Sequence, residues 1–379
     1  MNAPMTGRER ILAAIRHEEP DRAPISPRVG AWLTAVHGDA GLAKQLEVLP
    51  DMDFMHIVGD GTPNTIIAYP DEYALPEVQV EQRRYAEGNY EVVERTFHTP
   101  AGDLSDRTKI APAGREYGVM PNPIKTDHLV KGREDLAALR YILPPINTSF
   151  DHVHADQALI GDRGVTMVNI QSPLDHHAGD ARDMQDLMVD YYEDRAFFDE
   201  LLGIFHERGM AKLKAALEAG VEFIFGSWYF NSLSAGWSPR IFREVFVPQI
   251  REQVELTHSR GACYDYYDDG KLAGSLEMIA DTGVDVIETC TPPPVGDFDL
   301  AAAKASVGRK TTLKGYVDLL YVMKHGTPEL VEETIREAMA IAKPGGGFII
   351  GSSDSFREGT PDENIAAYFE ACTKHGGRG

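Results

Sequence analysis

The sequence has little cysteine and no long hydrophobic run. Its 379 residues include three cysteines, Cys263, Cys290 and Cys372, whose spacing gives no disulfide framework. A sparse, odd cysteine count indicates a reducing compartment. No segment approaches the roughly 20 apolar residues that a membrane-spanning helix needs, and residues 1–10 lack the apolar core of a signal peptide. We therefore expect a cytoplasmic protein with no membrane partner.

Basic residues are also scarce. There are 37 Lys and Arg residues against 59 Asp and Glu residues, so the formal net charge is -22. Nucleic acids and anionic membranes bind proteins through basic surfaces, so this composition disfavours both as partners. Hydrophobic residues make up 43% of the chain, which is enough for a substantial core. The length suits one large α/β barrel or two smaller domains.

A glycine-rich phosphate-binding loop is missing as well, because Gly345-Gly346-Gly347 precedes a predicted strand and does not open a helix. What the chain does contain is a regular alternation of strand and helix patterns. The alternation predicts a parallel sheet, and eight units predict a closed (β/α)8 TIM barrel, with a doubly wound open sheet as the alternative. The eight predicted strands cover residues 23–29, 53–59, 165–170, 221–226, 261–269, 284–288, 311–315 and 348–351.

The segment of about 75–115 has a different pattern. Polar and β-branched residues alternate there, and turn residues occur at 87–89 and 100–103. This pattern predicts an antiparallel β-hairpin meander inserted after the second strand. We expect residues 1–379 to form otherwise a single barrel domain. A capping box at Thr6–Glu9 predicts the first helix, and the pairs Ser238-Pro239, Thr327-Pro328 and Thr360-Pro361 predict three later helix starts.

In a barrel of this kind the chemistry lies at the carboxyl ends of the strands. The residues expected there are mostly carboxylates, with some aromatic residues and a few cations. A barrel end lined in this way can transfer protons, hold a divalent ion or bind a polar aromatic molecule. The candidates are Arg28, Asn169, His176, His177, Trp228, Tyr229, Asn231, Tyr267, Asp269, Glu288, Lys314 and Asp354.

Several of these residues have two interpretations. Side chains alternate along a strand, so Asp265, Tyr267 and Asp269 share one face, either as a solvated strand end or as a site for protons or a cation. The adjacent His176 and His177 are metal ligands or solvated loop residues, and Trp228 and Tyr229 either plug the barrel top or stack on a ligand. Cys263 is expected to pack, while Cys290 is either packed or a reactive thiolate.

Five segments resemble the uroporphyrinogen decarboxylase superfamily, and the opening segment resembles its methyltransferase-like branch. The resemblance covers nearly the whole chain and is specific for the superfamily, not for one activity. It implies a (β/α)8 barrel; members include porphyrinogen decarboxylases and zinc-dependent enzymes that move methyl groups between a substrate and a corrinoid protein or a thiol. The segments are 5–25, 291–297 (Thr-Pro-Pro-Pro-Val-Gly-Asp), 315–318 (Gly-Tyr-Val-Asp), 345–350 (Gly-Gly-Gly-Phe-Ile-Ile) and 360–365 (Thr-Pro-Asp-Glu-Asn-Ile).

Two departures from the family pattern narrow the function. The decarboxylases carry Arg-Gln-Ala-Gly-Arg after the first strand, where this chain has residues 26–32 with Arg28 alone. The thiol-activating methyltransferases carry His-x-Cys-Gly after the fifth strand and a further Cys after the eighth; residues 267–270 and Asp354 stand there instead. A soft Cys/His zinc site is therefore absent from the pattern. Asp269, Glu288 and Asp354 still offer oxygen ligands for a divalent metal, zinc included.

The resemblance then implies a substrate-side methyltransferase that demethylates a small O-, N- or S-methyl compound. A corrinoid on a separate protein would accept the methyl group, and Tyr267, Asp269 or Glu288 would protonate the leaving heteroatom. The remaining candidates would bind the substrate, Trp228 and Tyr229 by stacking or by cation–π attraction. The family also implies a homodimer.

Two other functions stay open. One is a decarboxylase or other lyase acting on a non-tetrapyrrole carboxylic acid that Arg28 and Lys314 would bind. The other is a non-catalytic binding protein on an enzyme scaffold, which the lost His and Cys positions favour.

Overall fold

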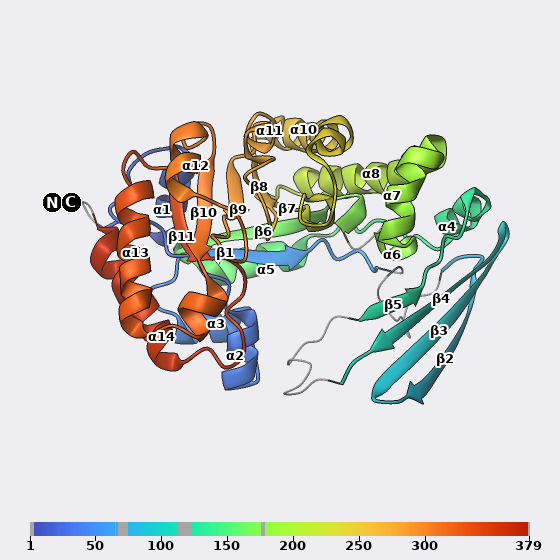
Figure 1. The fold of residues 1–379 in the computed structure, drawn as a ribbon, viewed down its shortest axis with the longest axis horizontal. Helices are drawn as coiled ribbons and strands as arrows, with labels where there is room; N and C mark the ends of the chain where they lie inside the picture. Colours follow the sequence, from blue (N-terminus) through green and yellow to red (C-terminus); the bar gives the residue numbers. More distant parts are fainter. Residues whose placement is uncertain (1–3, 65, 67–74, 113–122, 176–178, 378–379) are drawn as a thin grey trace. The chain divides into compact units, whose positions relative to one another are not determined.

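The computed structural model describes residues 4–64, 66, 75–112, 123–175 and 179–377. These residues form two compact units (Figure 1). The first unit contains residues 1–59, 149–170 and 216–379, and the second contains residues 60–148 and 171–215. The prediction of a single barrel domain stays a prediction. Within the described residues, no helix is both long and apolar enough to cross a membrane.

A curled seven-stranded sheet forms the centre of the first unit, with the strand order β1-β6-β7-β8-β9-β10-β11. Parallel pairing joins β1 to β6 and connects β7 through β11 in succession. The bounds of each of these strands differ from those of a predicted strand by at most two residues. They are β1 (Phe54–Gly59), β6 (Gly164–Gln171), β7 (Phe223–Ser227), β8 (Cys263–Tyr267), β9 (Val286–Thr289), β10 (Thr312–Val317) and β11 (Phe348–Ser352).

The predicted strand at residues 23–29 is not formed as a strand. Pro24 and Pro27 have no N–H group, so this segment cannot donate the hydrogen bonds of a continuous ladder. Two isolated parallel bridges remain, from Ile25 to Ile350 and from Arg28 to Ser355. The closed eight-stranded barrel is therefore not confirmed, and the segment lies beside β11 as an irregular chain.

The core of the first unit lies between helix α1 (Gly7–Ile15) and the inner face of the sheet. The predicted capping box is confirmed, because the Thr6 hydroxyl accepts from the Glu9 N–H and the Glu9 carboxylate accepts from the Thr6 N–H. The backbone N–H of Gly347 donates to the Ala14 carbonyl at 3.2 Å, which sets α1 at the amino ends of the last strands. Ile11 and Ala14 pack against Met55, Val165, Met167, Phe223, Phe225 and Ile349.

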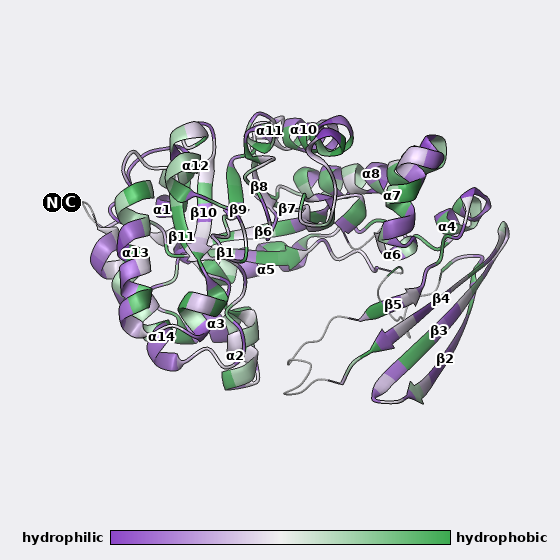
Figure 2. Cartoon of the chain, in the orientation of Figure 1, coloured by the Kyte–Doolittle hydropathy of each residue, from purple (hydrophilic) through white to green (hydrophobic). Residues whose placement is uncertain are grey.

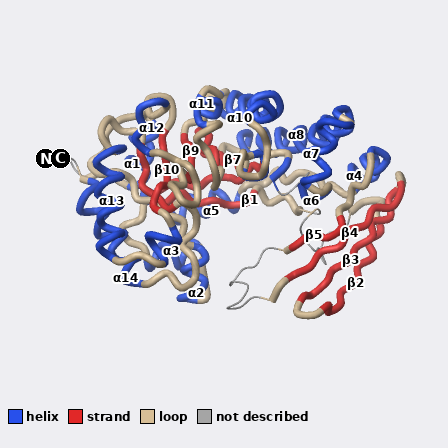
Figure 3. The backbone as a smooth tube through the Cα atoms, viewed as in Figure 1, coloured by secondary structure: helices blue, strands red, loops and turns tan. Residues whose placement is uncertain are grey.

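Helices lie outside the strands of this unit (Figure 3). Helix α13 (Pro328–Ala342) shows why: its buried residues Val331, Ile335 and Met339 recur at helical spacing, and the helix is coloured in hydrophobic and hydrophilic stripes (Figure 2). Burying such a stripe against the sheet stabilises both elements. The other helices are α2 (Gly30–His37), α3 (Leu42–Val48), α5 (Asp151–Ile160), α9 (Pro239–Ile241), α10 (Val247–His258), α11 (Leu276–Ala280), α12 (Leu300–Ser306) and α14 (Asp362–Gly376).

Two of the three predicted Ser/Thr-Pro helix starts are confirmed. The Ser238 hydroxyl accepts from the Ile241 N–H, and the Thr327 hydroxyl accepts from the Leu330 N–H. The third is different, because α14 begins one residue later and Thr360 donates its hydroxyl to the Arg357 carbonyl. Thr360 therefore stabilises the turn before the helix and does not cap it.

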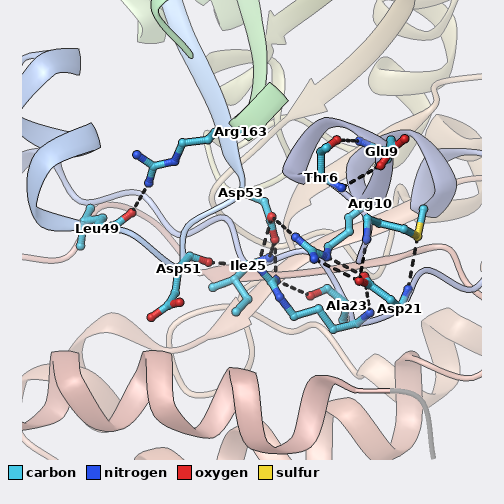
Figure 4. Close-up of polar contacts among 12 residues, drawn as sticks. Thr6, Glu9, Arg10, Asp21, Ala23, Ile25, Leu49, Asp51, Asp53 and Arg163 are labelled. Atoms are coloured by element: carbon cyan, nitrogen blue, oxygen red, sulfur yellow. Dashed lines mark hydrogen bonds and ion pairs between the residues drawn. The ribbon is translucent and has the colours of Figure 1, made fainter. Parts of the chain in front are cut away.

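A charged network holds the amino end of β1 (Figure 4). Asp53 accepts hydrogen bonds from Arg10 at 3.2 Å, from both terminal nitrogens of Arg22 at 2.6 and 3.2 Å, and from the backbone N–H of Ile25 at 2.8 Å. Arg10 also donates to Asp21. Four side chains from three segments are thus joined below the sheet, and we call them the amino-end network.

The second unit contains a four-stranded antiparallel sheet in the order β2-β3-β4-β5. It contains the antiparallel strands predicted at about 75–115, but it extends to residue 127; that it is an insertion into a closed barrel is not confirmed. Its buried Arg95 bonds Asp106, which also accepts from Lys125 at 2.7 Å. The elements are β2 (Gln79–Glu87), β3 (Tyr90–Thr99), β4 (Gly102–Ile110), β5 (Ile124–Asp127), α4 (Leu136–Tyr141), α6 (Gly179–Ala181), α7 (Met184–Glu193) and α8 (Arg195–Glu218), which continues into the first unit.

Candidate functional site

The candidate site of the first unit lies at the carboxyl ends of β8 to β11. Strand register explains the gathering, because Glu288 on β9 is the partner of both Tyr267 on β8 and Lys314 on β10. Asp354 follows β11, and Arg28 comes from the irregular segment bridged to the same strand end. Residues from five parts of the sequence therefore meet at one end of the sheet.

Five alternating charges run from the interior of the sheet to its rim, and we call them the ion chain. Glu288 accepts hydrogen bonds from both Lys314 and Arg28. A terminal nitrogen of Arg28 lies 3.9 Å from an Asp354 oxygen, and Arg357 donates to the other Asp354 oxygen at 2.9 Å. The exposed fraction of the side chain rises from 2% at Glu288 to 46% at Arg357. The chain is therefore rigid at its inner end and solvated at its outer end.

Ionic, aromatic and backbone contacts fix the position of Arg28. Its guanidinium lies 4.1 Å from the centroid of the Tyr267 ring and 5.0 Å from that of Phe225, both within cation–π distance. Its backbone N–H donates to the Ser352 hydroxyl at 3.0 Å. Burial alone would raise the pKa of Glu288, but the charges of Arg28 and Lys314 outweigh burial and lower it. Glu288 is therefore ionised, and both of its counter-ions, Arg28 and Lys314, are hydrogen-bonded to it.

Two further acids lie beside the ion chain with the opposite bias. Asp265 is 3% exposed, and neither of its carboxylate oxygens accepts a hydrogen bond from a described residue. Burial first, and then the charge of Glu288, raises the pKa of Asp265 well above its usual value. Burial and the charge of Asp354 raise the pKa of Asp269, although a hydrogen bond from the Tyr267 hydroxyl partly opposes them. Both acids are biased toward the neutral, proton-donating form.

A pocket of about 130 Å³ opens at the outer end of the ion chain. Its wall combines charged, hydroxyl and aliphatic side chains, so it can accept a small molecule with both polar and apolar parts. Asp269 lies at this pocket together with Asp354, so a bound molecule would meet a proton donor. The lining residues are Asp269, Thr291, Val295, Leu319, Leu320, Ser353, Asp354 and Arg357.

Residues 128–375, well over half of the chain, match the model of the family described as uroporphyrinogen decarboxylase (URO-D). This chain belongs to the uroporphyrinogen decarboxylase family. The resemblance inferred from the five sequence segments is therefore confirmed. The family match includes every strand from β6 to β11 and all lining residues of the pocket.

Individual relatives are more distant. Uroporphyrinogen decarboxylase 2, chloroplastic, of Arabidopsis thaliana is 30% identical over 38% of this chain and 34% of its own length. Methylated-thiol--coenzyme M methyltransferase of Methanosarcina mazei is 28% identical over 42% of this chain and 40% of its own length. The chain thus spans about a third to two fifths of the length of these curated relatives.

A solved structure titled methyltransferase from Methanosarcina mazei has a similar fold. It superposes with a TM-score of 0.62 over 98% of this chain and 99% of its own, at 16% sequence identity. At that identity the similarity establishes the fold and not the reaction.

In this uroporphyrinogen decarboxylase family member, Trp228 does not stack on a ligand. Its side chain is 0% exposed, its indole N–H donates to the Tyr264 hydroxyl at 2.8 Å, and its ring stacks on Tyr266 with the centroids 6.2 Å apart. The ligand-stacking prediction for Trp228 is wrong, because the buried side chain packs against Tyr264 and Tyr266 of β8 instead. Tyr229 is 37% exposed and packs edge-on against Phe230.

The other predicted substrate-binding residues are scattered. Asn169 lies at the end of β6, paired with Gly59, and Asn231 is buried in the short helical turn Tyr229–Asn231. Neither belongs to the lining of the pocket. His176 and His177 lie outside the described residues. Arg28 and Lys314 are in the site, but each is bound to Glu288. In the structure both are counter-ions of Glu288, and their role in substrate binding stays a prediction.

The predicted metal ligands are not assembled either. Among the residues that the structure describes, no group of three or more His, Cys, Asp or Glu side chains is placed to hold a metal ion. Glu288 bonds a cation through each carboxylate oxygen, so it does not join Asp269 and Asp354 as a ligand. The described side chains do not fit the predicted metal, and the proposals below use none.

Two cysteines considered as candidates are packed, Cys290 beside the site and Cys263 at the amino end of β8. Cys290 is buried and its thiol contacts the Ile287 carbonyl, and burial raises the pKa of that thiol. Burial likewise raises the pKa of Cys263 to about 12. Neither thiol is placed to act as a thiolate, so the packed interpretation holds for both.

Sequence reasoning missed two members of the site. Asp265 was placed on the same strand face as Tyr267 and Asp269, but it was not chosen as a site residue. Arg357 follows Asp354 by three residues in the turn before α14, and their side chains form an ion pair. Strand alternation is the pattern that identifies Asp265, whereas no local pattern identifies Arg357.

Proposed function

We propose that this chain transfers a methyl group from a small O-, N- or S-methyl compound to a corrinoid carried by a second protein. Membership of the uroporphyrinogen decarboxylase family supports an enzyme, and the relative named methylated-thiol--coenzyme M methyltransferase supports methyl transfer. The observation that carries the proposal is Asp269, an acid with a raised pKa that lines a pocket of small-molecule size.

The chemistry needs such an acid. When the carbon–heteroatom bond of the substrate breaks, its electron pair stays on the heteroatom, and the acceptor supplies the electron pair of the new bond to the methyl carbon. An alkoxide or phenoxide leaves poorly, so a proton delivered from Asp269 to the heteroatom lowers the barrier. Asp269 then regains a proton from water through the open pocket.

The three predicted catalytic residues take different roles in this scheme. Glu288 is ionised and bonded to two cations, so it cannot donate a proton; it fixes Arg28. Tyr267 lies under the Arg28 guanidinium and hydrogen-bonds Asp269, so it positions the acid. Burial and the negative charge of Asp354 raise the pKa of Asp269, which favours its proton-bearing form. Asp269 remains as the proton donor.

The test combines the purified protein, a corrinoid protein reduced to the cob(I)alamin state, and a panel of O-, N- and S-methyl compounds. Methyl transfer changes the visible spectrum of the corrinoid. Asp269→Asn should slow the change by about 10² to 10⁴-fold, whereas Asp281→Asn, at an exposed ion pair with Lys310, should not. The rate should fall as pH rises through the pKa of Asp269, because only the protonated acid can donate. A silent spectrum across the whole panel would reject the proposal.

A decarboxylase acting on a small carboxylic acid is the second candidate. Most of the curated relatives found are uroporphyrinogen decarboxylases, and Arg357 places a partly exposed cation at the pocket. The buried cations Arg28 and Lys314 do not add to it, since both are bound to Glu288. Release of carbon dioxide from a panel of carboxylic acids, without any methyl acceptor, distinguishes this candidate from methyl transfer.

A further inference from the structure

Among the described residues that line the pocket, Arg357 is the cation that a ligand can engage. Lys314 and Arg28 are fixed on Glu288 inside the sheet, but Arg357 is 46% exposed and donates one hydrogen bond, to Asp354. Exposed ion pairs contribute little to stability because water screens both charges. Arg357 can therefore exchange Asp354 for another carboxylate at small cost.

Asp354 does not lose all its compensation when Arg357 turns away. A terminal nitrogen of Arg28 lies 3.9 Å from the other Asp354 oxygen, and Arg28 itself cannot leave. The ion chain thus offers a fixed cation behind Asp354 and an exchangeable cation in front of it. Removing the front cation leaves Asp354 with a charge partner.

The remaining wall describes the rest of the ligand. Val295, Leu319 and Leu320 supply aliphatic surface, and Asp269 supplies a carboxyl group with a raised pKa that can bond a heteroatom. The volume of about 130 Å³ is close to that of a cavity of about 150 Å³ that holds benzene. A fitting molecule therefore has an anionic end, a compact apolar body and one heteroatom.

We propose that the substrate is a small methoxy carboxylic acid, whose carboxylate binds Arg357 while its ether oxygen meets Asp269. This inference rests on the proposed methyl transfer and narrows it to methyl ethers. A quaternary ammonium compound releases a neutral amine and needs no acid, whereas an ether does. The reaction converts the methoxy acid to the hydroxy acid: the methyl carbon leaves with the acceptor's electron pair, and the ether oxygen keeps the bond pair and takes the Asp269 proton.

Binding is measured by calorimetry, without any acceptor, so that it is independent of turnover. The probes are methoxyacetate and 2-methoxybenzoate, with their uncharged amides and the cationic (2-methoxyethyl)trimethylammonium for comparison. The acids should bind at least about tenfold more tightly than the amides, since hydrogen bonds between charged groups are the stronger ones. Equal affinity for acid and amide, or tighter binding of the cation, would overturn the proposal.

Two variants should shift acid affinity in opposite directions. Arg357→Gln should remove the preference for acid over amide, and Asp354→Asn should strengthen acid binding several-fold, because it frees Arg357 from its competitor. Arg336→Gln is the matched control: Arg336 forms an exposed ion pair with Glu333 at the same three-residue spacing. If Arg357→Gln retains the preference while its melting temperature matches wild type, Arg357 is not the carboxylate-binding residue.

Methyl transfer and the methoxy-acid substrate are rejected by different results. Tight acid binding that depends on Arg357, with no transfer to reduced corrinoid, would leave the carboxylate site standing and reject methyl transfer. Transfer from neutral ethers or N-methyl compounds, with no preference for acids, would keep methyl transfer and reject the methoxy acid.

Discussion

Two aspartates of the first unit are equally buried but differ in the hydrogen bonds that their carboxylates accept. Asp53 is 2% exposed and accepts four hydrogen bonds in the amino-end network, whereas Asp265 is 3% exposed and accepts none from a described residue. Burial raises the pKa of both, but Arg22 opposes it directly at Asp53. At the amino end of the sheet, the carboxylates of Asp53 and Asp21 bind cations and join separate segments of the chain. At the carboxyl end Glu288 does the same, whereas the raised pKa values of Asp265 and Asp269 favour their protonated forms.

The strongest test of this comparison removes the carboxylate that does tie segments together at the carboxyl end. Glu288→Ala leaves Arg28 and Lys314 buried without their shared counter-ion, which should cost about 3–5 kcal/mol of unfolding free energy. Urea denaturation measures the loss. Glu332→Ala, at an exposed pair with Lys374, is the control and should cost far less. Equal losses would mean that the ion chain does not hold the site together.

Breaking the amino-end network should have the next largest effect. Asp53→Ala removes four hydrogen bonds but leaves Arg10 and Arg22 partly exposed to water, so we expect a loss of about 2–3 kcal/mol. Chemical denaturation and ligand binding are measured on the same preparation. Binding at the pocket should be unchanged, because the network lies at the opposite end of the sheet. Weakened binding would contradict the division of roles between the two ends.

The contrasting variant is Asp265→Asn, which keeps the shape of a side chain that makes no described hydrogen bond. At neutral pH it should leave stability unchanged or raise it by up to about 1 kcal/mol, because Asn cannot ionise and so avoids the cost of a buried acid with a raised pKa. The sign of the pH dependence follows from the raised pKa. Between the ordinary carboxyl pKa of about 3.9 and the higher pKa of folded Asp265, the unfolded chain has lost the proton that the folded chain keeps.

Wild type therefore loses stability relative to Asp265→Asn as pH rises through that window, and the two converge below it. Urea titrations at a series of pH values measure the difference. A variant that is uniformly less stable, with no dependence on pH, would mean that Asp265 is bonded in solution and not an isolated acid.

The smallest effect on stability is expected at the outer end of the ion chain. Arg357→Gln should change the unfolding free energy by less than about 0.5 kcal/mol, because the pair with Asp354 is solvated. Thermal and urea unfolding of the variant should overlay wild type. A loss above about 1 kcal/mol would show that Arg357 is structural, and the contrast between a fixed interior and an exchangeable rim would fail.

Most of the local structure could be predicted because its causes are local. The strand at 348–351 and the Thr327 cap depend on neighbours within a few residues, and both are formed. The segment 23–29 was wrong because its apolar residues favour a strand while Pro24 and Pro27 remove the donors that a strand needs.

The site could be predicted in part. Asp269 and Asp354 share a pocket as expected, because carboxyl ends of neighbouring strands meet at one edge of a sheet. Side-chain pairing could not be predicted. Arg28 and Glu288 are 260 residues apart in sequence, and nothing local indicates that Glu288 takes both cations. Trp228 shows the same limit, since its direction is decided by Tyr264 on the next strand.

The proline-containing segment at 23–28 also protects the sheet from other molecules. The outer edge of β11 would otherwise present a row of backbone groups that a strand from another chain can join. The N–H of Ile350 donates to the Pro24 carbonyl, and its carbonyl accepts from the Ser26 N–H. The prolines have no N–H to donate to a further strand. The segment that replaces a regular strand thus covers the edge of β11 and limits its pairing with strands of other molecules.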